Sequence, residues 1–238
     1  MVERVVSLVP SLTESVAATA PGLLVGATDW CTHPADLAVT RIGGTKNPDV
    51  ARILSLRPDV VLANEEENRS ADLDALGSAG VAVWVTQVRS VDEALDSLDR
   101  MLRVACGLAR PDWLDDAAAT WATVQPGPAL TAAIPIWRRP WMVLGRDTFA
   151  GDVLARLGVR NAFAGHAERY PRVPLADIQE AELIVLPDEP YAFSATDGPE
   201  CFPGQPVALV SGRHLTWYGP SMVDAPRVLA AQLSAASP

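Results

Sequence analysis

The sequence predicts an α/β protein with two lobes, each built on a mostly parallel sheet, joined by a helical connector. Three observations indicate this fold. Strand and helix signals alternate over residues 1–89, an amphipathic helical pattern fills residues 90–125, and the alternation resumes over residues 126–238. Such alternation is typical of parallel sheets whose two faces are covered by helices. We therefore expect an N-terminal α/β lobe, a connecting backbone helix and a C-terminal α/β lobe with these boundaries.

The first lobe carries three signals for helix ends. Ser11 and Glu14 have the spacing of a capping box, which predicts a helix that begins at Ser11. Asn47-Pro48 predicts a second helix, with proline at its first position, that runs to about Leu56. Gly80 is expected to end a third helix in the left-handed conformation. The expected strands are residues 4–9, 23–27, 60–62 and 81–86.

The connector has the clearest helical pattern in the chain. Ser90 and Glu93 form a second capping box, and the apolar residues that follow recur on one face of a helix. The pattern resumes from Trp113 to about Val124, and Pro126-Gly127-Pro128 ends it. A helical connector is stiff, unlike a Gly/Ser linker.

The second lobe repeats the alternation. We expect strands at 130–136, 141–144, 183–186 and 207–210, and helices at about 148–157, 174–181 and 224–236. Residues 51–62 and 176–186 share an order of short helix and aliphatic strand, each followed by an acidic loop. Two interpretations stay open. This is the ordinary pattern of any αβ unit, or the lobes share a topology and each offers a loop at a strand's carboxyl end, where open α/β sheets bind ligands.

The composition excludes several classes of partner and bounds the location. The formal net charge is −10, whereas nucleic acids and anionic membranes need a positive patch, so we expect neither as a partner. We also expect a monomer. Cys31, Cys106 and Cys201 leave open whether any disulfide forms. No apolar run approaches the roughly 18 residues of a transmembrane helix. A strand-like run follows Met1 directly, without the pattern of a signal peptide. We therefore expect a cytoplasmic location unless a leader has been removed.

Signatures of catalysis are missing from the sequence. It contains no P-loop, no G-x-G-x-x-G after the first strand and no G-x-S-x-G elbow. Ser211 lies near His214, but nothing marks it as a nucleophile. Asp29, Cys31 and His33 are metal-ligand types, yet no second ligand pair has zinc-site spacing. We expect no enzymatic activity and no intrinsic cofactor.

Aromatic and acidic clusters follow several strand signals. Trp137 and Trp141 flank a basic turn, and Trp217-Tyr218 lies beyond the last expected strand. Such rings form either ordinary lobe core or the wall of a site for an apolar, planar ligand. Glu65-Glu66-Glu67 likewise forms either a solvated loop near a helix N-terminus or a site for a cation or basic partner.

The order of motifs resembles class III periplasmic binding proteins, the helical-backbone family. Within it, the chain is most similar to the vitamin B12-binding proteins of cobalamin importers. The stretches that carry the resemblance are residues 4–14 (RVVSLVPSLTE), 26–31 (GATDWC), 42–44 (IGG), 56–63 (LRPDVVLA) and 217–233. The resemblance implies two Rossmann-like lobes joined by one long backbone helix, with a largely preformed ligand cleft between the lobes.

The resemblance also implies which residues bind the ligand. From the first lobe these are Ser11, Thr13, Trp30, Glu65, Glu66 and Asn68. From the rest of the chain they are Arg146, Asp147, Phe149, Glu189, Tyr191, Phe193, His214, Trp217 and Tyr218. As a neutral imidazole, His214 is the expected axial ligand to a metal held inside the ligand.

The implied function is non-catalytic binding of a cobalamin-like corrinoid or another metal chelate, with ABC-type uptake as one use of that binding. Siderophore or haem binding stays open, as do a cytoplasmic tetrapyrrole-processing enzyme and a sensor subunit. Family members that dock on a permease place an acidic residue on each lobe. Glu67 suits the first lobe, whereas Gly219 stands where the second acid is expected.

Overall fold

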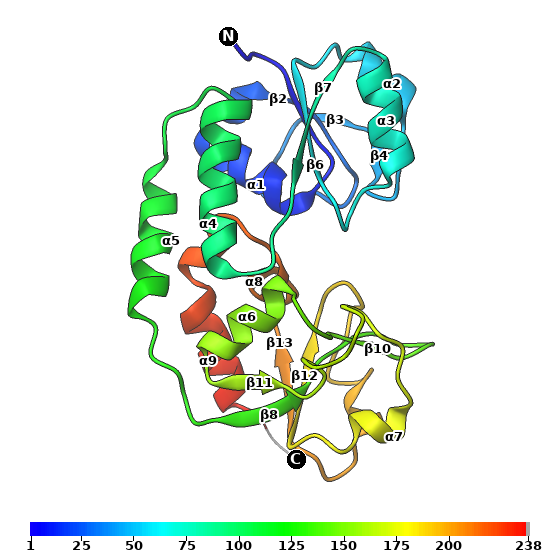
Figure 1. Cartoon of the computed structure of the whole chain (residues 1–238), viewed down its shortest axis with the longest axis vertical. Helices are drawn as coiled ribbons and strands as arrows, with labels where there is room; N and C mark the ends of the chain where they lie inside the picture. The colour runs from blue at the N-terminus through cyan, green and yellow to red at the C-terminus, as the bar shows by residue number, and fades with distance from the viewer. Residues whose placement is uncertain (237–238) are drawn as a thin grey trace. The chain divides into compact units, whose positions relative to one another are not determined.

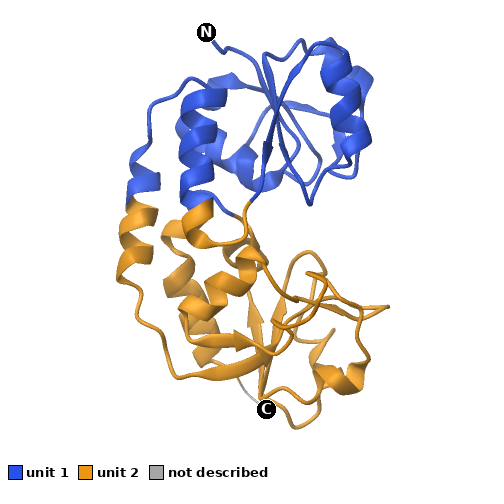
Figure 2. Cartoon of the chain, in the orientation of Figure 1, with its two compact units in different colours: residues 1–87, 94–115, 218–220 blue, residues 88–93, 116–217, 221–238 orange. Residues whose placement is uncertain are grey.

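The chain forms two compact α/β units. A computed structural model describes residues 1–236. Residues 1–87, 94–115 and 218–220 make unit 1, and residues 88–93, 116–217 and those from 221 onward make unit 2 (Figure 2). Each unit has its own parallel sheet, so the two-lobed α/β fold expected from the sequence is confirmed.

The sheet of unit 1 has five parallel strands in the order β3-β2-β1-β6-β7 (Figure 1). Their bounds are β1 Val5–Ser7, β2 Leu24–Ala27, β3 Thr40–Arg41, β6 Val60–Asn64 and β7 Ala82–Thr86. β1 and β6 are buried along their whole length, which is why they read as continuous apolar runs rather than alternating ones. The four strands expected here are confirmed, and β3 is an addition too short to leave a pattern.

Three helices belong wholly to unit 1: α1 (Pro10–Thr19), α2 (Val50–Ser55) and α3 (Ser70–Ser78). The capping box expected at Ser11 and Glu14 is wrong. α1 begins at Pro10, its N-cap residue is Val9, and no side chain caps it. Proline presets the helical backbone angle and has no N–H to satisfy, so the helix begins there without a polar cap.

The start expected for α2 is also wrong. Asn47–Pro48 forms β5, which pairs antiparallel with β4 (Gly43–Gly44). The N–H of Asp49 still donates to Ile42 O at 2.8 Å, so the chain stays extended to this point. The Asp49 carboxylate then accepts from Arg52 N at 2.9 Å and caps the helix. The helix end at Gly80 is confirmed, since Gly80 has φ of 83° and donates to Gly77 O.

Residues 90–125 form two helices. Ser90 Oγ accepts from Glu93 N at 3.2 Å, which confirms the second capping box. α4 (Val91–Arg100) continues as a π-helical turn over Met101–Ala105, and α5 spans Asp112–Thr123. Residues 106–111 interrupt the helical pattern because Gly107 adopts φ of 67° and Pro111 cannot donate a backbone bond.

The sheet of unit 2 has four parallel strands in the order β11-β8-β12-β13. Their bounds are β8 Leu130–Ala133, β11 Val159–Asn161, β12 Leu183–Pro187 and β13 Val207–Val210. The expected strand at 130–136 splits, since β9 (Pro135–Trp137) leaves the sheet and pairs antiparallel with β10 (Met142–Val143).

Four helices complete unit 2: α6 (Phe149–Arg156), α7 (Leu175–Ile178), α8 (Gly212–Thr216) and α9 (Ala225–Ser234). One set of buried side chains joins the sheet to the β9–β10 hairpin and includes Ile184, Leu186, Phe193 and Phe202. None of the helices within residues 1–236 has the length and apolar character needed to cross a membrane. Cys31, Cys106 and Cys201 are all free thiols.

Candidate functional site

In unit 1, polar side chains meet where β6 and β7 end. Asn64, the last residue of β6, is buried. Its Nδ2 donates to the hydroxyl of Tyr218 at 2.8 Å and to the carbonyl of Thr86 at 3.1 Å. Its Oδ1 accepts from the backbone N–H groups of Glu66 at 2.8 Å and Glu67 at 3.2 Å. One amide therefore fixes the start of the acidic loop and joins it to the neighbouring strand.

Tyr218 closes this network from a distant part of the chain. Its hydroxyl lies 3.0 Å from Thr86 Oγ1, and burial raises the pKa of Tyr218, so the phenol stays protonated. The next residue, Gly219, packs against α1. A Cβ at this position would stand 2.9 Å from Ser15 Oγ and 3.0 Å from Ser11 O. Position 219 therefore has no room for an acidic side chain.

The two hydroxyl residues expected from the first loop lie inside α1. Ser11 and Thr13 are both buried. Thr13 Oγ1 donates to Val9 O at 3.0 Å and lies 3.0 Å from the thiol of Cys31. Burial raises the pKa of Cys31, so this thiol is neutral and acts as a packing group.

The loop after β2 is rigid and presents a tryptophan. Arg41 donates to the carbonyl groups of Thr28 at 2.9 Å and Cys31 at 2.8 Å, which fixes residues 28–31 at the start of this loop. Between them, Trp30 is 65% exposed, and its indole nitrogen lies near Gly44 of the β4–β5 hairpin. An exposed indole on a braced loop offers a flat apolar face to a ligand.

The acidic loop after β6 is partly covered. Glu65 accepts from Gln87 Nε2 at 2.6 Å, and Lys46 donates to the backbone carbonyl of Glu66. Asn68 is buried, and its Oδ1 accepts from the backbone N–H that begins this segment, at 2.9 Å. Hydrogen bonds thus fix the loop at several points, while Glu67 is exposed, so both interpretations of the acidic loop stay open.

In unit 2, the ends of β12 and β13 are joined by two carboxylates. Asp188 Oδ1 accepts from Gly212 N at 2.5 Å, and Glu189 Oε2 accepts from the indole N–H of Trp217 at 2.9 Å. Gly212 is required here, since a Cβ would lie 2.6 Å from the backbone nitrogen of Glu189. Glu189 and Trp217 thus form one fixed pair.

His214 lies on the short helix α8 after β13. Its Nδ1 is 2.8 Å from Ser211 Oγ, one helical turn earlier. A hydrogen bond to one ring nitrogen is the usual way in which a protein orients a metal-binding imidazole. Within residues 1–236, no group of three His, Cys, Asp or Glu side chains is placed to hold a bare metal ion.

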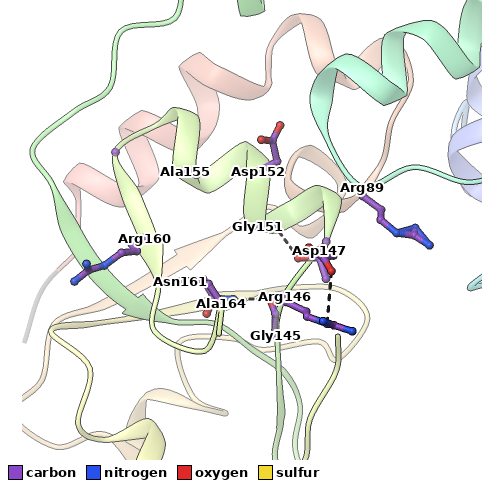
Figure 3. A pocket seen from close by; sticks show the side chains of 12 residues that line it. Arg89, Gly145, Arg146, Asp147, Gly151, Asp152, Ala155, Arg160, Asn161 and Ala164 are labelled. Carbon is purple, nitrogen blue, oxygen red and sulfur yellow. Dashed lines mark hydrogen bonds and ion pairs between the residues drawn. The ribbon is translucent and has the colours of Figure 1, made fainter. Parts of the chain in front are cut away.

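Arg146 and Asp147 line a hollow of about 470 Å³ beside α6 and β11 (Figure 3). Its charged lining consists of Arg89, Arg146, Asp147, Asp152 and Arg160, and its remaining lining is mainly glycine and alanine. Arg146 pairs with Asp147 at 3.5 Å, while Asp152 is already engaged by a hydrogen bond from Val91 N at 2.8 Å. The hollow therefore offers arginines to an anionic group.

Three expected aromatic residues differ in exposure. Phe193 is buried in the core of unit 2, and Phe149 is buried at the first position of α6. Tyr191 is half-buried, and its hydroxyl donates to Asp197 Oδ2 at 2.7 Å. That hydrogen bond raises the pKa of Tyr191.

The expected site residues thus form two local groups, one in each unit. Most of them follow strands of the two parallel sheets, at the edge where such sheets bind ligands. Arg146, Asp147 and Phe149 instead follow β10 of the antiparallel hairpin, and Trp217 and Tyr218 follow α8. Asn64, Thr86 and Arg89 were not among the site residues expected from the sequence. A polar residue at the end of a buried apolar strand was the available signal for Asn64.

The family assignment comes from comparison with known sequences. The sequence model of the periplasmic binding protein family matches residues 5–185. The chain belongs to this family. Its members are non-catalytic solute receptors, so the expectation of a binding protein rather than an enzyme is confirmed.

The relatives agree with this assignment. A vitamin B12-binding protein of Vibrio cholerae is 24% identical over 202 residues, which cover 81% of this chain and 72% of the relative. A vitamin B12-binding protein of Pectobacterium carotovorum is 22% identical over 253 residues, which cover 99% of this chain and 90% of the relative.

Solved structures show the same fold. The periplasmic vitamin B12 binding protein of Vibrio cholerae matches with a TM-score of 0.78 and 21% identity, over 98% of this chain and 97% of that chain. An apo periplasmic heme-binding protein from Roseiflexus sp. RS-1 matches with a TM-score of 0.79 and 20% identity, over 98% of each chain.

Proposed function

We propose that this chain is a receptor for a metal chelate, with a cobalamin-like corrinoid as its first candidate ligand. The main support is the similarity to vitamin B12-binding proteins, which covers up to 99% of the chain. The loops at the carboxyl ends of both sheets suit such a ligand, because they combine rigid aromatic faces with a few fixed polar groups.

The chemistry of these loops supports a large, partly apolar ligand. The exposed indole of Trp30 offers apolar contact. The fixed pair Glu189–Trp217 and the braced segment Glu65–Glu66 offer hydrogen-bond acceptors for amide groups. Since these groups are held in place before any ligand arrives, binding loses little conformational entropy. The candidate ligand contacts in the two units, and the cleft between the lobes, remain predictions.

His214 remains the proposed axial ligand to the chelated metal. Its orientation by Ser211 fits that role, since metal-binding imidazoles are usually held through the second ring nitrogen. Replacing His214 by Ala should alter the visible spectrum of the bound chelate, whereas a role limited to packing would leave the spectrum unchanged.

A second candidate ligand is a carboxylate-bearing tetrapyrrole such as heme. The arginines of the hollow in unit 2 favour it, because charge-assisted bonds from arginine to carboxylate are strong and directional. Hemin would then bind more tightly than its dimethyl ester, and Arg146→Gln would remove most of that difference.

Docking on an ABC permease is also proposed, with Glu67 as the contact of unit 1. Glu67 is exposed, as docking requires. A second acidic contact at position 219 does not fit, because Gly219 packs against Ser11 and Ser15. Proteins of this family are usually periplasmic, and fractionation of cells that express the native gene would show where this chain is located.

The proposed function is tested by titrating the purified chain with cyanocobalamin, hemin and a ferric hydroxamate siderophore. Isothermal calorimetry and absorption spectra should show saturable, one-to-one binding of at least one of them. The proposal fails if none of the three binds saturably to a chain that unfolds cooperatively in urea.

A further inference from the structure

The β9–β10 hairpin of unit 2 carries two tryptophans in opposite environments. Trp141 packs into the core, with its ring stacked on Phe193 at 6.1 Å and edge-on to Phe202 at 5.7 Å. Trp137, at the end of β9, is 42% exposed. Of the two interpretations left open for these rings, lobe core therefore applies to Trp141. Trp137 instead presents an aromatic surface.

Trp137 is held in one orientation by its neighbour. The Trp137 and Tyr191 rings meet edge to face, with centroids 5.7 Å apart and planes at 83°. Tyr191 in turn rests on the buried ring of Phe193 at 4.6 Å. Edge-to-face packing of this kind stabilises a particular ring orientation beyond simple burial.

A charged cluster beneath the rings fixes Tyr191. Asp197 accepts from the Tyr191 hydroxyl at 2.7 Å and pairs with Arg138. Arg138 also pairs with Glu200 at 2.6 Å and lies over the Trp141 ring, 5.7 Å from its centroid. The Arg138 side chain is 12% exposed, whereas those of Asp197 and Glu200 are 42% and 50% exposed, so the cluster lies at the surface with its arginine largely covered.

The rings of Trp137 and Tyr191, together called the aromatic rim, lie at the edge of unit 2 where its parallel strands end. Tyr191 comes from the loop that follows β12, the same loop that places Glu189 against Trp217. β9 packs beside β12 and ends at Trp137. Both rings of the rim are therefore at the carboxyl end of the strand that carries the proposed ligand contacts.

We propose that Trp137 and Tyr191 form an aromatic subsite that stacks on a flat, conjugated part of the ligand, with Arg138 and Asp197 as positioning residues. The proposal rests on the proposed function and narrows its ligand class to chelates with a planar conjugated ring. A single exposed tryptophan is common on protein surfaces. This one differs because its partner Tyr191 is held by a hydrogen bond to Asp197 and by the buried ring of Phe193, and Asp197 is itself paired with Arg138.

The test measures the affinity of the unaltered chain and of matched variants for the best ligand among cyanocobalamin and hemin. Trp137→Ala should weaken binding about 3- to 10-fold, the range expected for one aromatic stacking pair. Trp137→Phe should restore most of the affinity. Leu130→Ala is the control, since Leu130 is 40% exposed in the same unit but lies at the amino end of β8, and it should leave affinity unchanged.

Asp197→Asn separates positioning from general stability. If Asp197 acts through the rim, its substitution weakens binding in the unaltered chain and has no further effect in the Trp137→Ala variant. Urea unfolding of each variant shows whether its fold is intact.

The outcomes are distinguishable. If the unaltered chain binds a ligand, and the Trp137→Ala and Leu130→Ala variants bind it with equal affinity, the subsite is overturned and the proposed function stands. If Asp197→Asn lowers the affinity equally in the unaltered chain and in the Trp137→Ala variant, the positioning role is overturned. Failure of the unaltered chain to bind either ligand overturns this inference, while binding of the siderophore alone would preserve the proposed receptor function.

Discussion

At the scale of single residues, Asn64 connects more of unit 1 than any charged residue of the acidic loop. It lies at the end of a completely buried strand and makes side-chain hydrogen bonds in two directions. One direction fixes the backbone of the loop, and the other reaches Tyr218 and β7. The backbone of the loop is therefore positioned mainly by a neutral amide.

Replacing Asn64 by Ala should destabilise the chain by about 2–4 kcal/mol, because several buried donors and acceptors would lose their partners at once. Urea unfolding followed by circular dichroism measures this change. Asn47→Ala is the control, since Asn47 is exposed, and it should change the free energy of unfolding by less than about 0.5 kcal/mol. Equal effects of the two substitutions would show that the Asn64 network contributes little.

Only part of the candidate site could be predicted from the sequence, residue by residue. The family resemblance, and no local pattern, placed Trp30 among the expected contacts; the ring is exposed, and its contact with a ligand stays a prediction. Phe193 and Trp141 were not separable in sequence from the exposed Trp137, since all three lie near strand ends. Their burial depends on packing between segments about 50 residues apart, which local sequence does not encode.

At the scale of elements, the two capping boxes show what local sequence predicts and what it misses. Ser90 and Glu93 precede a strongly amphipathic segment with no competing start signal, and the cap forms. Ser11 and Glu14 have the same spacing, but Pro10 starts the helix one residue earlier. Long strands in apolar runs were predictable. β11 and α8 were missed because three and five residues are too few to show a period.

Ser90→Ala should destabilise the chain by about 1 kcal/mol, since the Glu93 N–H would lose its side-chain acceptor. The urea midpoint should fall without a change in the slope of the transition. Ser70→Ala provides the comparison, because Ser70 also stands at a helix start but α3 has no side-chain cap. A midpoint for Ser90→Ala that matches that of Ser70→Ala would contradict the importance of the cap.

At the scale of the whole molecule, both sheets are parallel, and this explains where the polar groups gather. In a parallel sheet all strands end at one edge, so loops distant in sequence meet there without long connections. The interiors of the two units consist of apolar strands, whereas Asn64 and the pair Glu189–Trp217 all lie at strand ends. Apolar side chains therefore fill the interiors of the units, and fixed polar groups gather at the carboxyl ends of the strands.

A receptor for an intact chelate should be stabilised by that chelate and not by its bare metal. At a concentration one hundred times the dissociation constant, a ligand that binds only the folded chain raises the free energy of unfolding by about 2.7 kcal/mol. We expect this for cyanocobalamin or hemin, with a urea midpoint that rises with the logarithm of ligand concentration. Cobalt or ferric salts alone should have no such effect, because residues 1–236 contain no cluster of three metal-ligating side chains. Equal stabilisation by the metal salt and by the chelate would contradict recognition of the macrocycle.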